Sequence, residues 1–303
     1  MKQPGTITPD SEYRGLIAML PPKLRGFALL ARFDRPIGWW LLFWPCAFGL
    51  LLSGGLAAHW DLLLWFLIGS IAMRGAGCVY NDIIDRDLDA KVARTASRPL
   101  PAGVVTLRAA WIWLILLCLT GLVVLLQLRW EAQLLALGSL ALVAAYPFMK
   151  RITWWPQAWL GMVFSWGALV GWIAVQGGWD PAMAWLYAGS IFWVIGYDTI
   201  YAMQDREDDA LVGIRSSALR LGGHLRTGVA VCYLLTLTAW GMALWSVRPQ
   251  AMALIALVPA ALHLMWQAGS LKADGDDALA KFRSNRFAGL LMALACLTIG
   301  SSA

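Results

Sequence analysis

A membrane-embedded bundle of about nine helices is the fold that this sequence predicts. The composition is the first reason, because 60% of the 303 residues are apolar and only 14% are charged. A soluble domain of this length carries more charge and lacks repeated apolar stretches near the length that crosses a bilayer. The second reason is that tryptophan and tyrosine crowd the ends of these stretches, as interfacial anchors do. We therefore expect an all-α, polytopic membrane protein.

The apolar stretches follow one another from residue 36 to the C-terminus and are separated by short breaks. The breaks hold turn-forming residues, such as Ser53-Gly54, Gly177-Gly178 and Arg248-Pro249. We expect a single transmembrane domain over 36–303 around a central cavity, preceded by a cytoplasmic N-terminal segment over 1–35. The predicted spans are 36–57, 61–80, 107–128, 131–149, 155–176, 182–203, 227–247, 249–270 and 286–302.

Three further features exclude other classes of protein. The N-terminal residues lack the short apolar core and small-residue cleavage site of a secretory signal, so we expect no cleavable signal peptide. The five cysteines stand singly in apolar stretches without metal-ligand spacing, which indicates packing residues. The net charge of +6 is typical of cytoplasmic loops in a membrane protein, and we predict no nucleic-acid partner.

The basic residues predict the orientation of the chain in the membrane. If the N-terminus lies in the cytoplasm, only two of the 24 lysines and arginines, Arg129 and Arg248, fall on the opposite side. This asymmetry follows the positive-inside rule. It places the two acidic clusters described next on the cytoplasmic face.

Half of the 18 acidic residues gather in two short segments or just before the second of them. The first cluster reads NDIIDRDLD over 81–89, and the second reads DREDD over 205–209. Carboxylates crowded at a membrane boundary repel one another and lose hydration, so they need a compensating cation. Hard oxygen ligands of this kind suit Mg²⁺. The clusters therefore predict a site that holds Mg²⁺ and a highly charged substrate.

Helical spacing selects three members of the first cluster. Asn81, Asp85 and Asp89 are spaced i, i+4, i+8 and therefore share one face of a helix. We predict that this row binds Mg²⁺ and a diphosphate, whose departure as a leaving group the metal stabilises. Asp87 lies off the row, and we interpret it as an ordinary solvated charge.

The second cluster supplies a matching row only if its helix is long enough. Asp198, Asp205 and Asp209 are spaced i, i+7, i+11 and share a face if the helix continues past Asp205. Asp205 and Asp209 are the predicted metal ligands. Opposed across a cavity, the two rows would bind two Mg²⁺ ions bridged by a diphosphate. We interpret Glu207 and Asp208 as solvated charges.

Basic residues follow each acidic cluster. The segments 85–92 and 205–212 align as a weak internal repeat, and each precedes a stretch that contains arginine and hydroxyl side chains. Arginine can hold phosphate oxygens in a bidentate fork, although charge that sets topology is the alternative interpretation. The predicted diphosphate contacts are Asn81, Lys91, Arg94, Arg98 and Arg215.

Other charged residues lie within or beside the predicted spans. Asp198 lies inside an apolar stretch, where an unpaired carboxylate is costly and usually functional. Arg35 and the pair Lys150-Arg151 lie at membrane boundaries. One of them would bind an anionic co-substrate, and snorkelling into the lipid interface is the alternative.

Several motifs accompany the acidic clusters in a fixed order. They are DRPIG at 34–38, RTASRPLP at 94–101, YPFMKR at 146–151 and YDTIYAMQD at 197–205. Together with the acidic rows they resemble the UbiA family of intramembrane aromatic prenyltransferases, from about residue 30 to the C-terminus. One departure is Arg215, where the family pattern Gly-Ile-Lys-Ser has lysine, and the positive charge is kept.

The resemblance implies an activity, a cofactor and partners. The chain would transfer a polyprenyl group from polyprenyl diphosphate to 4-hydroxybenzoate, at the carbon ortho to the hydroxyl, in ubiquinone biosynthesis. The donor tail would lie in an apolar tunnel open to membrane lipid. The expected location is the bacterial cell inner membrane, with the active site facing the cytoplasm. The residues implied to bind Mg²⁺ and the donor diphosphate are Asn81, Asp85, Asp89, Asp205 and Asp209.

The resemblance also assigns the acceptor side. Arg151 is implied to handle the hydroxybenzoate, and our hypothesis for Asp198 is that it positions the acceptor or assists loss of the ring proton. These two are the predicted catalytic residues. The predicted acceptor-binding residues are Arg35, Lys150, Arg151 and Asp198.

Two alternatives remain open at this point. The same diphosphate chemistry would serve another acceptor, such as homogentisate, a naphthoate, haem or chlorophyllide. A secondary transporter also has intramembrane carboxylates and internal repeats, but its binding site lies near the bilayer midplane, whereas both acidic rows lie at one face. The prenyl chain length is not set by the sequence, because the length of a tunnel is a three-dimensional property.

Overall fold

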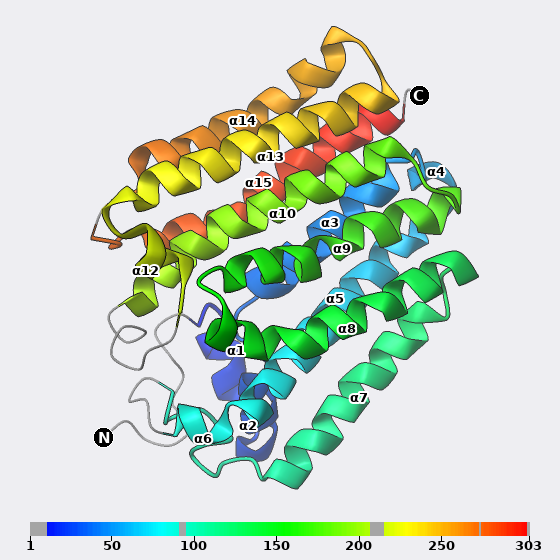
Figure 1. The fold of residues 1–303 in the computed structure, drawn as a ribbon. Coiled ribbons are helices and arrows are strands. Elements are labelled where there is room, and N and C mark those ends of the chain that lie inside the picture. Colours follow the sequence, from blue (N-terminus) through cyan, green and yellow to red (C-terminus); the bar gives the residue numbers. More distant parts are fainter. Residues whose placement is uncertain (1–10, 91–94, 207–214, 273, 302–303) are drawn as a thin grey trace. The chain divides into compact units, whose positions relative to one another are not determined.

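The computed structural model describes residues 11–90, 95–206, 215–272 and 274–301, and these residues are helical throughout apart from short turns and loops (Figure 1). This confirms the predicted all-α class. The chain forms two compact units. Unit 1 consists of Met1–Trp40 and Leu67–Leu126, and unit 2 consists of Leu41–Phe66 and Gln127–Ala303. Two helices, α3 (Ile37–Leu52) and α5 (Asp61–Ile84), contribute residues to both units.

Unit 1 combines short N-terminal helices with long apolar ones. Pro22 occupies the first turn of its helix, where its fixed φ suits a helix and its missing N–H costs nothing. The Thr106 side chain accepts a hydrogen bond from the Ala109 N–H at 3.2 Å and so caps the last helix of the unit. Besides residues 67–84 of α5, the helices are α1 (Arg14–Met19), α2 (Pro22–Leu30), α6 (Arg86–Asp89) and α7 (Leu107–Leu125).

The core of unit 1 joins α2, α5 and α7. Leu30 and Val79 are fully buried, and Leu114 and Leu117 pack against them from α7. Gly75 lets these elements approach closely, because a Cβ at that position would lie 3.2 Å from the Phe33 ring and 3.3 Å from the Ala31 methyl. The acidic end of α5 is therefore held by α2, by the residues that follow it, and by α7.

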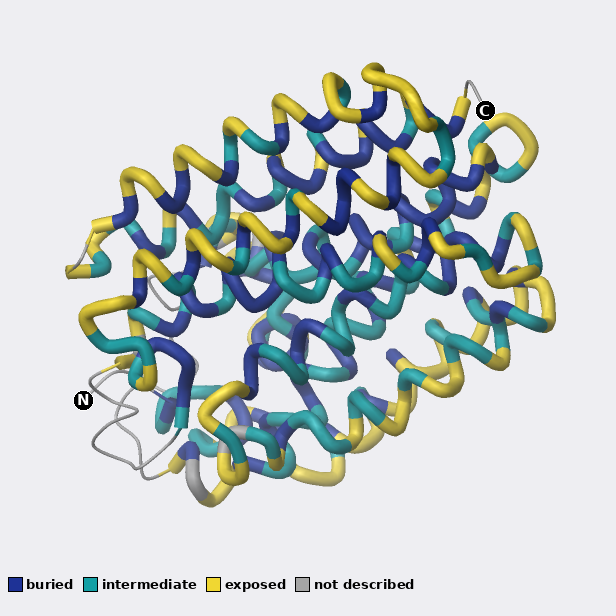
Figure 2. The backbone as a smooth tube through the Cα atoms, turned by 45° about the horizontal axis from the view of Figure 1, so that its top comes forward, coloured by how far each residue is buried: buried dark blue, intermediate teal, exposed yellow. Residues whose placement is uncertain are grey.

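Unit 2 is organised around α10, which packs against α9, α13 and α15. Buried and exposed positions alternate turn by turn along its peripheral helices, such as α13 and α14 (Figure 2). Besides residues 41–52 of α3, the main helices are α8 (Trp130–Ile152), α9 (Pro156–Gln176), α10 (Pro181–Tyr201), α13 (Leu225–Val247), α14 (Ala251–Ser270) and α15 (Ala278–Gly300). Short elements complete the unit: α4 (Leu56–His59), η1 (Ala202–Asp205), α12 (Ser217–Leu221) and η2 (Gly222–His224).

Small residues allow α3 and α9 to come into backbone contact. A Cβ on Gly171 would overlap the carbonyl oxygen of Cys46, and a Cβ on Gly49 would overlap that of Ala168. Glycine at such positions is typical of helix packing in membranes, where close approach replaces the hydrophobic driving force of water.

Six helices in the described part of the chain are long and apolar enough to cross a membrane. They correspond to predicted spans, and α3 is a shorter apolar helix. The predicted spans 182–203 and 286–302 coincide with α10 and α15, which are helical but do not meet the same criterion. The protein is thus a multi-pass helical membrane protein, and the total of nine crossings stays a prediction. The six spans are Asp61–Ile84, Leu107–Leu125, Trp130–Met149, Pro156–Gln176, Ser217–Val247 and Ala251–Ser270.

Candidate active site

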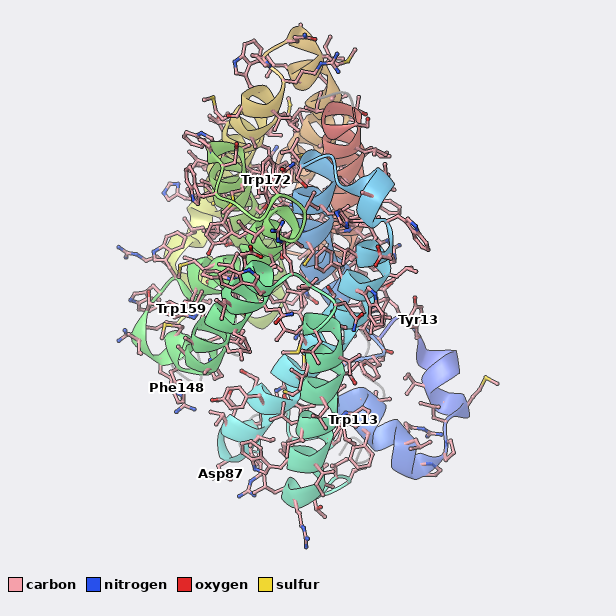
Figure 3. All side chains as sticks on the ribbon, turned by 90° about the vertical axis from the view of Figure 1, so that its right-hand side faces the viewer. Tyr13, Asp87, Trp113, Phe148, Trp159 and Trp172 are labelled. Carbon is pink, nitrogen blue, oxygen red and sulfur yellow. The ribbon has the colours of Figure 1, made fainter. Side chains whose placement is uncertain are left out.

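The first acidic motif lies where α5 passes into α6. The Asp85 N–H donates to the Asn81 carbonyl at 2.9 Å, and the Asp89 N–H donates to the Asp85 carbonyl at 2.8 Å. Helical hydrogen bonding therefore continues through the junction, and the predicted row shares one face. The Asp85 and Asp89 side chains are buried, whereas Asn81 is half-buried. Asp87 is 86% exposed and, among the described residues, pairs with the neighbouring Arg86, as expected of a solvated charge (Figure 3).

A carboxylate outside the predicted row is the centre of the charge network. Asp82 is 1% exposed, and both of its oxygens accept from Arg32 Nη2, at 2.9 and 3.0 Å. Arg98 Nη1 lies 3.3 Å from Asp82 Oδ1 and 2.7 Å from Asp89 Oδ2. The predicted diphosphate contact Arg98 therefore joins the row to Asp82, which the helical spacing alone did not select.

The backbone of Arg32 is held in an uncommon conformation. Its φ is 57°, in the left-handed region that residues other than glycine rarely adopt. The side chain also donates to the Leu29 carbonyl at 2.8 Å. Strain of this kind persists only where surrounding contacts fix it, and here the paired Asp82 carboxylate does so. From the sequence alone, Arg32 is only one of the basic residues that predict the orientation of the chain.

The loop after α6 turns back toward the acidic motif. Thr95 Oγ1 donates to the Asp89 carbonyl at 2.8 Å, and the Arg98 N–H donates to the Thr95 carbonyl at 2.9 Å. These two bonds bring the Arg98 guanidinium back to the Asp89 carboxylate. Lys91 and Arg94, two other predicted diphosphate contacts, lie outside the described residues.

The donor set of the first motif fits Mg²⁺ bound together with a phosphate-bearing substrate. Burial raises the pKa of Asp89, Arg98 lowers it, and the nearby Asp82 and Asp85 raise it further, so the net shift is upward. An added cation would relieve this crowding. No group of three His, Cys, Asp or Glu side chains in the described part of the chain could hold a metal by itself. Mg²⁺ usually binds through one or two carboxylates plus substrate phosphates, which Asp85 and Asp89 can provide.

The second acidic motif does not continue the helix before it. The α-helix α10 ends at Tyr201, and the 3₁₀ turn η1 follows as far as Asp205. A 3₁₀ turn has three residues per turn, so the condition for Asp198, Asp205 and Asp209 to share an α-helical face is not met. The side chain of Asp205 and all of Asp209 lie outside the described residues. Their metal-binding roles stay predictions.

Buried hydrogen bonds join the start of α12, which follows the second motif in the chain, to α9 and α10. Thr199 Oγ1 and Ser217 Oγ lie 2.7 Å apart, and the Ser217 N–H donates to Gln157 Oε1 at 3.2 Å. All three residues are buried. They join the starts of α9 and α12 to α10 one residue after Asp198. Ser217, at the start of α12, is thus hydrogen-bonded both to α10 and to α9.

The remaining predicted site residues have varied surroundings. Arg215 donates to the Ile152 carbonyl at 2.6 Å, and its guanidinium lies 5.6 Å from the Trp154 ring centre. Asp198 is half-buried on α10. Arg35 pairs with the buried Asp34 at 3.3 Å, within unit 1. Arg151 is exposed near the end of α8, and the neighbouring Lys150 side chain lies outside the described residues. No described contact tests the roles predicted for these residues.

A buried polar network in unit 2 was not selected from the sequence. Asn285 accepts from Trp193 Nε1 at 2.8 Å and donates to Gln267 Oε1 at 3.3 Å, and Tyr233 donates to the same Gln267 oxygen at 2.6 Å. The network joins α10, α13, α14 and α15. Trp193 in turn contacts the Tyr197 ring edge-on at 5.2 Å. Polar residues within apolar spans were the available signal, because interhelical hydrogen bonds stabilise membrane bundles.

The fold and the charge cluster define the class of protein: a multi-pass helical membrane protein with paired, buried carboxylates at the end of a spanning helix. A model of the UbiA prenyltransferase family matches residues 42–295, and the chain belongs to this family.

Curated relatives extend the similarity over nearly the whole chain. A mitochondrial 4-hydroxybenzoate polyprenyltransferase of Caenorhabditis elegans is 41% identical, covering 96% of this chain and 82% of its own. The enzyme of the same name from Arabidopsis thaliana is 40% identical, and the match covers 96% of this chain and 72% of that one. The one from Homo sapiens is 42% identical, and the match covers 90% of this chain and 75% of that one.

Solved structures share the fold at lower sequence identity. A UbiA homologue from Aeropyrum pernix matches with a TM-score of 0.68 at 24% identity, over 86% of this chain and 97% of that one. A homologue from Archaeoglobus fulgidus, bound to GPP and Mg²⁺, matches with a TM-score of 0.68 at 16% identity, over 92% and 100%.

Proposed function

We propose that this chain transfers a polyprenyl group from polyprenyl diphosphate to 4-hydroxybenzoate, at the ring carbon ortho to the hydroxyl, with release of diphosphate in ubiquinone biosynthesis. Membership of the UbiA family and identities of 40–42% to enzymes named for this substrate support the proposal. The structural observation that carries it is the buried row of Asp85 and Asp89, joined to Arg98.

The diphosphate half of the proposal rests on the first motif. When bound, Mg²⁺ would neutralise the phosphates and stabilise diphosphate as it leaves. Asp85 and Asp89 would hold the metal together with Asn81. Arg98 has five N–H donors, and among the described residues only those on Nη1 contact a carboxylate. Its other N–H groups would bind phosphate oxygens. Asp205, Asp209, Lys91, Arg94 and Arg215 are proposed for the same substrate on sequence grounds alone.

The acceptor half of the proposal rests on charged residues outside the first motif. Asp198 would position the phenol or accept the ring proton after the ring carbon attacks the allylic centre. Arg151, with Arg35 and Lys150 as further candidates, would bind the benzoate carboxylate, since arginine matches carboxylate geometry. Apolar helices around the reacting carbon would exclude water, which would otherwise capture an allylic cation.

We also propose a location. The positive-inside pattern favours an active site that faces the cytoplasm of a bacterial inner membrane. The curated relatives described above are named as mitochondrial proteins. Fractionation of cells that express a tagged chain, with cysteine labelling of Asp87→Cys from one side of inverted vesicles, would test both parts.

The decisive experiment is a prenylation assay with the purified chain in lipid nanodiscs. Labelled polyprenyl diphosphates of graded length are supplied with 4-hydroxybenzoate, and parallel reactions contain homogentisate or a naphthoate. We expect diphosphate release and a prenylated product with 4-hydroxybenzoate only, and only with Mg²⁺. Turnover with another acceptor alone would reassign the substrate, and full turnover in EDTA would overturn the metal proposal.

A matched pair of variants locates the chemistry. Asp85→Asn keeps the size of a buried side chain but removes its charge, and we expect activity to fall at least about a hundredfold. Asp87→Asn makes the same change two residues away on an exposed side chain and should leave activity nearly unchanged. Equal activities in the two variants would show that the first motif is not part of the active site.

A further inference from the structure

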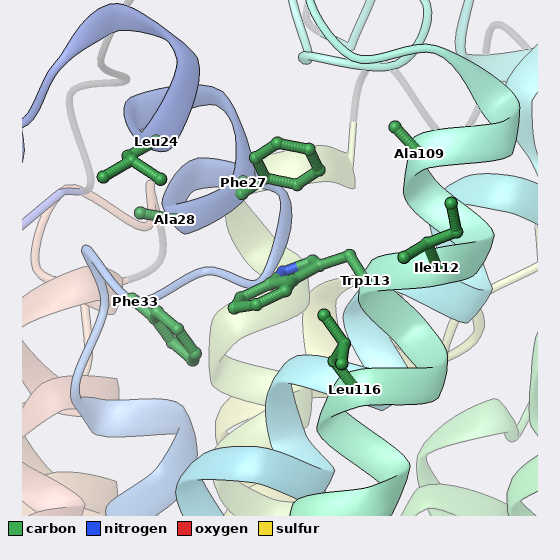
Figure 4. A pocket seen from close by; sticks show the side chains of 8 residues that line it. All are labelled: Leu24, Phe27, Ala28, Phe33, Ala109, Ile112, Trp113 and Leu116. Atoms are coloured by element: carbon green, nitrogen blue, oxygen red, sulfur yellow. The ribbon is translucent and has the colours of Figure 1, made fainter.

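An apolar pocket of about 490 Å³ lies in unit 1, between α2 and α7 (Figure 4). Phe27 of α2 and Phe33, just after α2, line one side of the pocket. Ile112, Trp113 and Leu116 line the other side from α7. The Trp113 ring contacts both phenylalanine rings, with centroids 5.8 and 6.3 Å away. None of its lining residues belongs to the charge cluster or to a predicted site.

The side of the pocket formed by α7 belongs to the lipid-facing surface. The window of α7 that can span a membrane is only 17% buried. Ile112 is 52% exposed and Leu116 is 49% exposed, and both line the pocket. In a membrane the pocket is thus continuous with the hydrocarbon layer. An occupant with an apolar chain could enter from the bilayer without crossing water.

Two polar groups limit the chemistry of that occupant. Trp113 Nε1 is buried and donates no hydrogen bond to any residue that the structure describes. A buried donor without an acceptor is costly, so the pocket favours an occupant that offers a carbonyl oxygen. Arg108 precedes Ile112 by one helical turn on the same face, is exposed, and forms no ion pair with a described residue. A cation at this rim favours an anionic group.

The spacing of these two groups matches a glycerophospholipid. Arg108 and Trp113 are five residues apart on α7, which corresponds to about 7.5 Å along the axis. The headgroup region of one leaflet is of similar thickness, about 5–8 Å, and separates the phosphate from the acyl boundary. We propose that the pocket binds one acyl chain of an anionic phospholipid. Its ester carbonyl accepts from the Trp113 indole, and its phosphate contacts Arg108.

The test uses the full chain in nanodiscs that contain a phosphatidylglycerol with a photoreactive diazirine on its acyl chain. We expect labelled peptides to include residues 107–116. Ala109→Trp fills the pocket and should lower labelling about tenfold. Leu122→Trp, which makes a similar change at an exposed position deeper on α7 and outside the pocket, should not lower it.

Two conservative variants keep the test decisive if Ala109→Trp fails to fold. Trp113→Phe keeps the ring but removes the N–H, and should weaken labelling. Arg108→Gln should abolish the preference for phosphatidylglycerol over phosphatidylcholine. Equal labelling of Ala109→Trp and Leu122→Trp would overturn the site. Displacement of the lipid by a polyprenyl diphosphate at low concentration, but not by unlabelled phosphatidylglycerol, would assign the pocket to another occupant.

Discussion

Arg98 and Asp89, nine residues apart, are joined by a 2.7 Å bond from Nη1 to Oδ2, and the same nitrogen lies 3.3 Å from Asp82. One guanidinium therefore connects a proposed metal ligand to a buried carboxylate that Arg32 already pairs. This arrangement separates two roles within the acidic cluster. Asp82 orders the cluster, whereas the Asp85 and Asp89 row carries the proposed chemistry.

Replacing Arg98 should affect the donor substrate more than the acceptor. We expect Arg98→Gln to lower kcat/KM for polyprenyl diphosphate by about tenfold to a hundredfold, the effect of about 1.4–2.7 kcal/mol of lost binding. The apparent affinity for 4-hydroxybenzoate should change little. Arg86→Gln is the control, because Arg86 pairs with the exposed Asp87 in a surface contact worth little. If both variants lose activity equally, the proposed contact between Arg98 and the donor diphosphate is wrong.

Removing the Asp82 carboxylate should destabilise the protein. Asp82→Ala leaves Arg32, whose side chain is only 13% exposed, without its partner. Removal of one member of a buried pair typically costs about 3–5 kcal/mol. The unfolding transition in detergent should therefore shift to lower temperature. The control Asp87→Ala should unfold like the parent chain, and a parent-like transition in Asp82→Ala would contradict the ordering role.

The contact between Thr199 and Ser217 should position the second motif. Thr199→Val removes the hydroxyl group at nearly constant shape. We expect a higher KM for the polyprenyl diphosphate donor or a higher Mg²⁺ requirement. The free energy of unfolding should fall by about 1 kcal/mol. Ser190→Ala on the same helix also removes a buried interhelical hydrogen bond, to Trp240 at 3.3 Å. Ser190→Ala should lose comparable stability but keep its KM. A parallel rise in KM in both variants would indicate a general effect of packing.

Close packing between α3 and α9 should make Gly171 sensitive to a single methyl group. Gly171→Ala places a Cβ against the Cys46 carbonyl, so the helices must separate. Overpacking of this kind costs about 1–3 kcal/mol, measurable as a lower unfolding temperature. A Cβ on Gly178 would meet no atom within 4 Å, so Gly178→Ala should leave the unfolding temperature nearly unchanged. The prediction fails if the two variants unfold at the same temperature.

Metal and diphosphate together should stabilise the folded chain. At a hundred times the dissociation constant, a ligand that binds only the folded state adds about 2.7 kcal/mol. We expect Mg²⁺ with a non-reactive thio-diphosphate analogue to raise the unfolding temperature, and EDTA to reverse the rise. Asp85→Asn should show no such response, whereas Asp87→Asn should respond fully. A parent-like response in Asp85→Asn would exclude Asp85 as a ligand.

Local patterns were enough to predict the class of fold and the first row. Bilayer thickness sets the length of apolar stretches, so the all-helical membrane fold follows from composition and spacing. The α-helical repeat likewise predicts that Asn81, Asp85 and Asp89 share one face. The same repeat does not carry the predicted row of Asp198 and Asp205 past Tyr201, because the turn that follows α10 is a 3₁₀ turn and not an α-helix.

The sequence by itself determined that this chain is a helical membrane protein with a carboxylate row of helical period, since both properties arise from residues close together in the chain. Only the tertiary structure decided which basic residue meets which acid. Arg32 pairs with Asp82 across 50 positions, and Arg98 returns to Asp89 through the Thr95 turn. The pocket around Trp113 likewise exists only where α2 packs on α7. Such pairings depend on how distant helices pack, and no local periodicity encodes that choice.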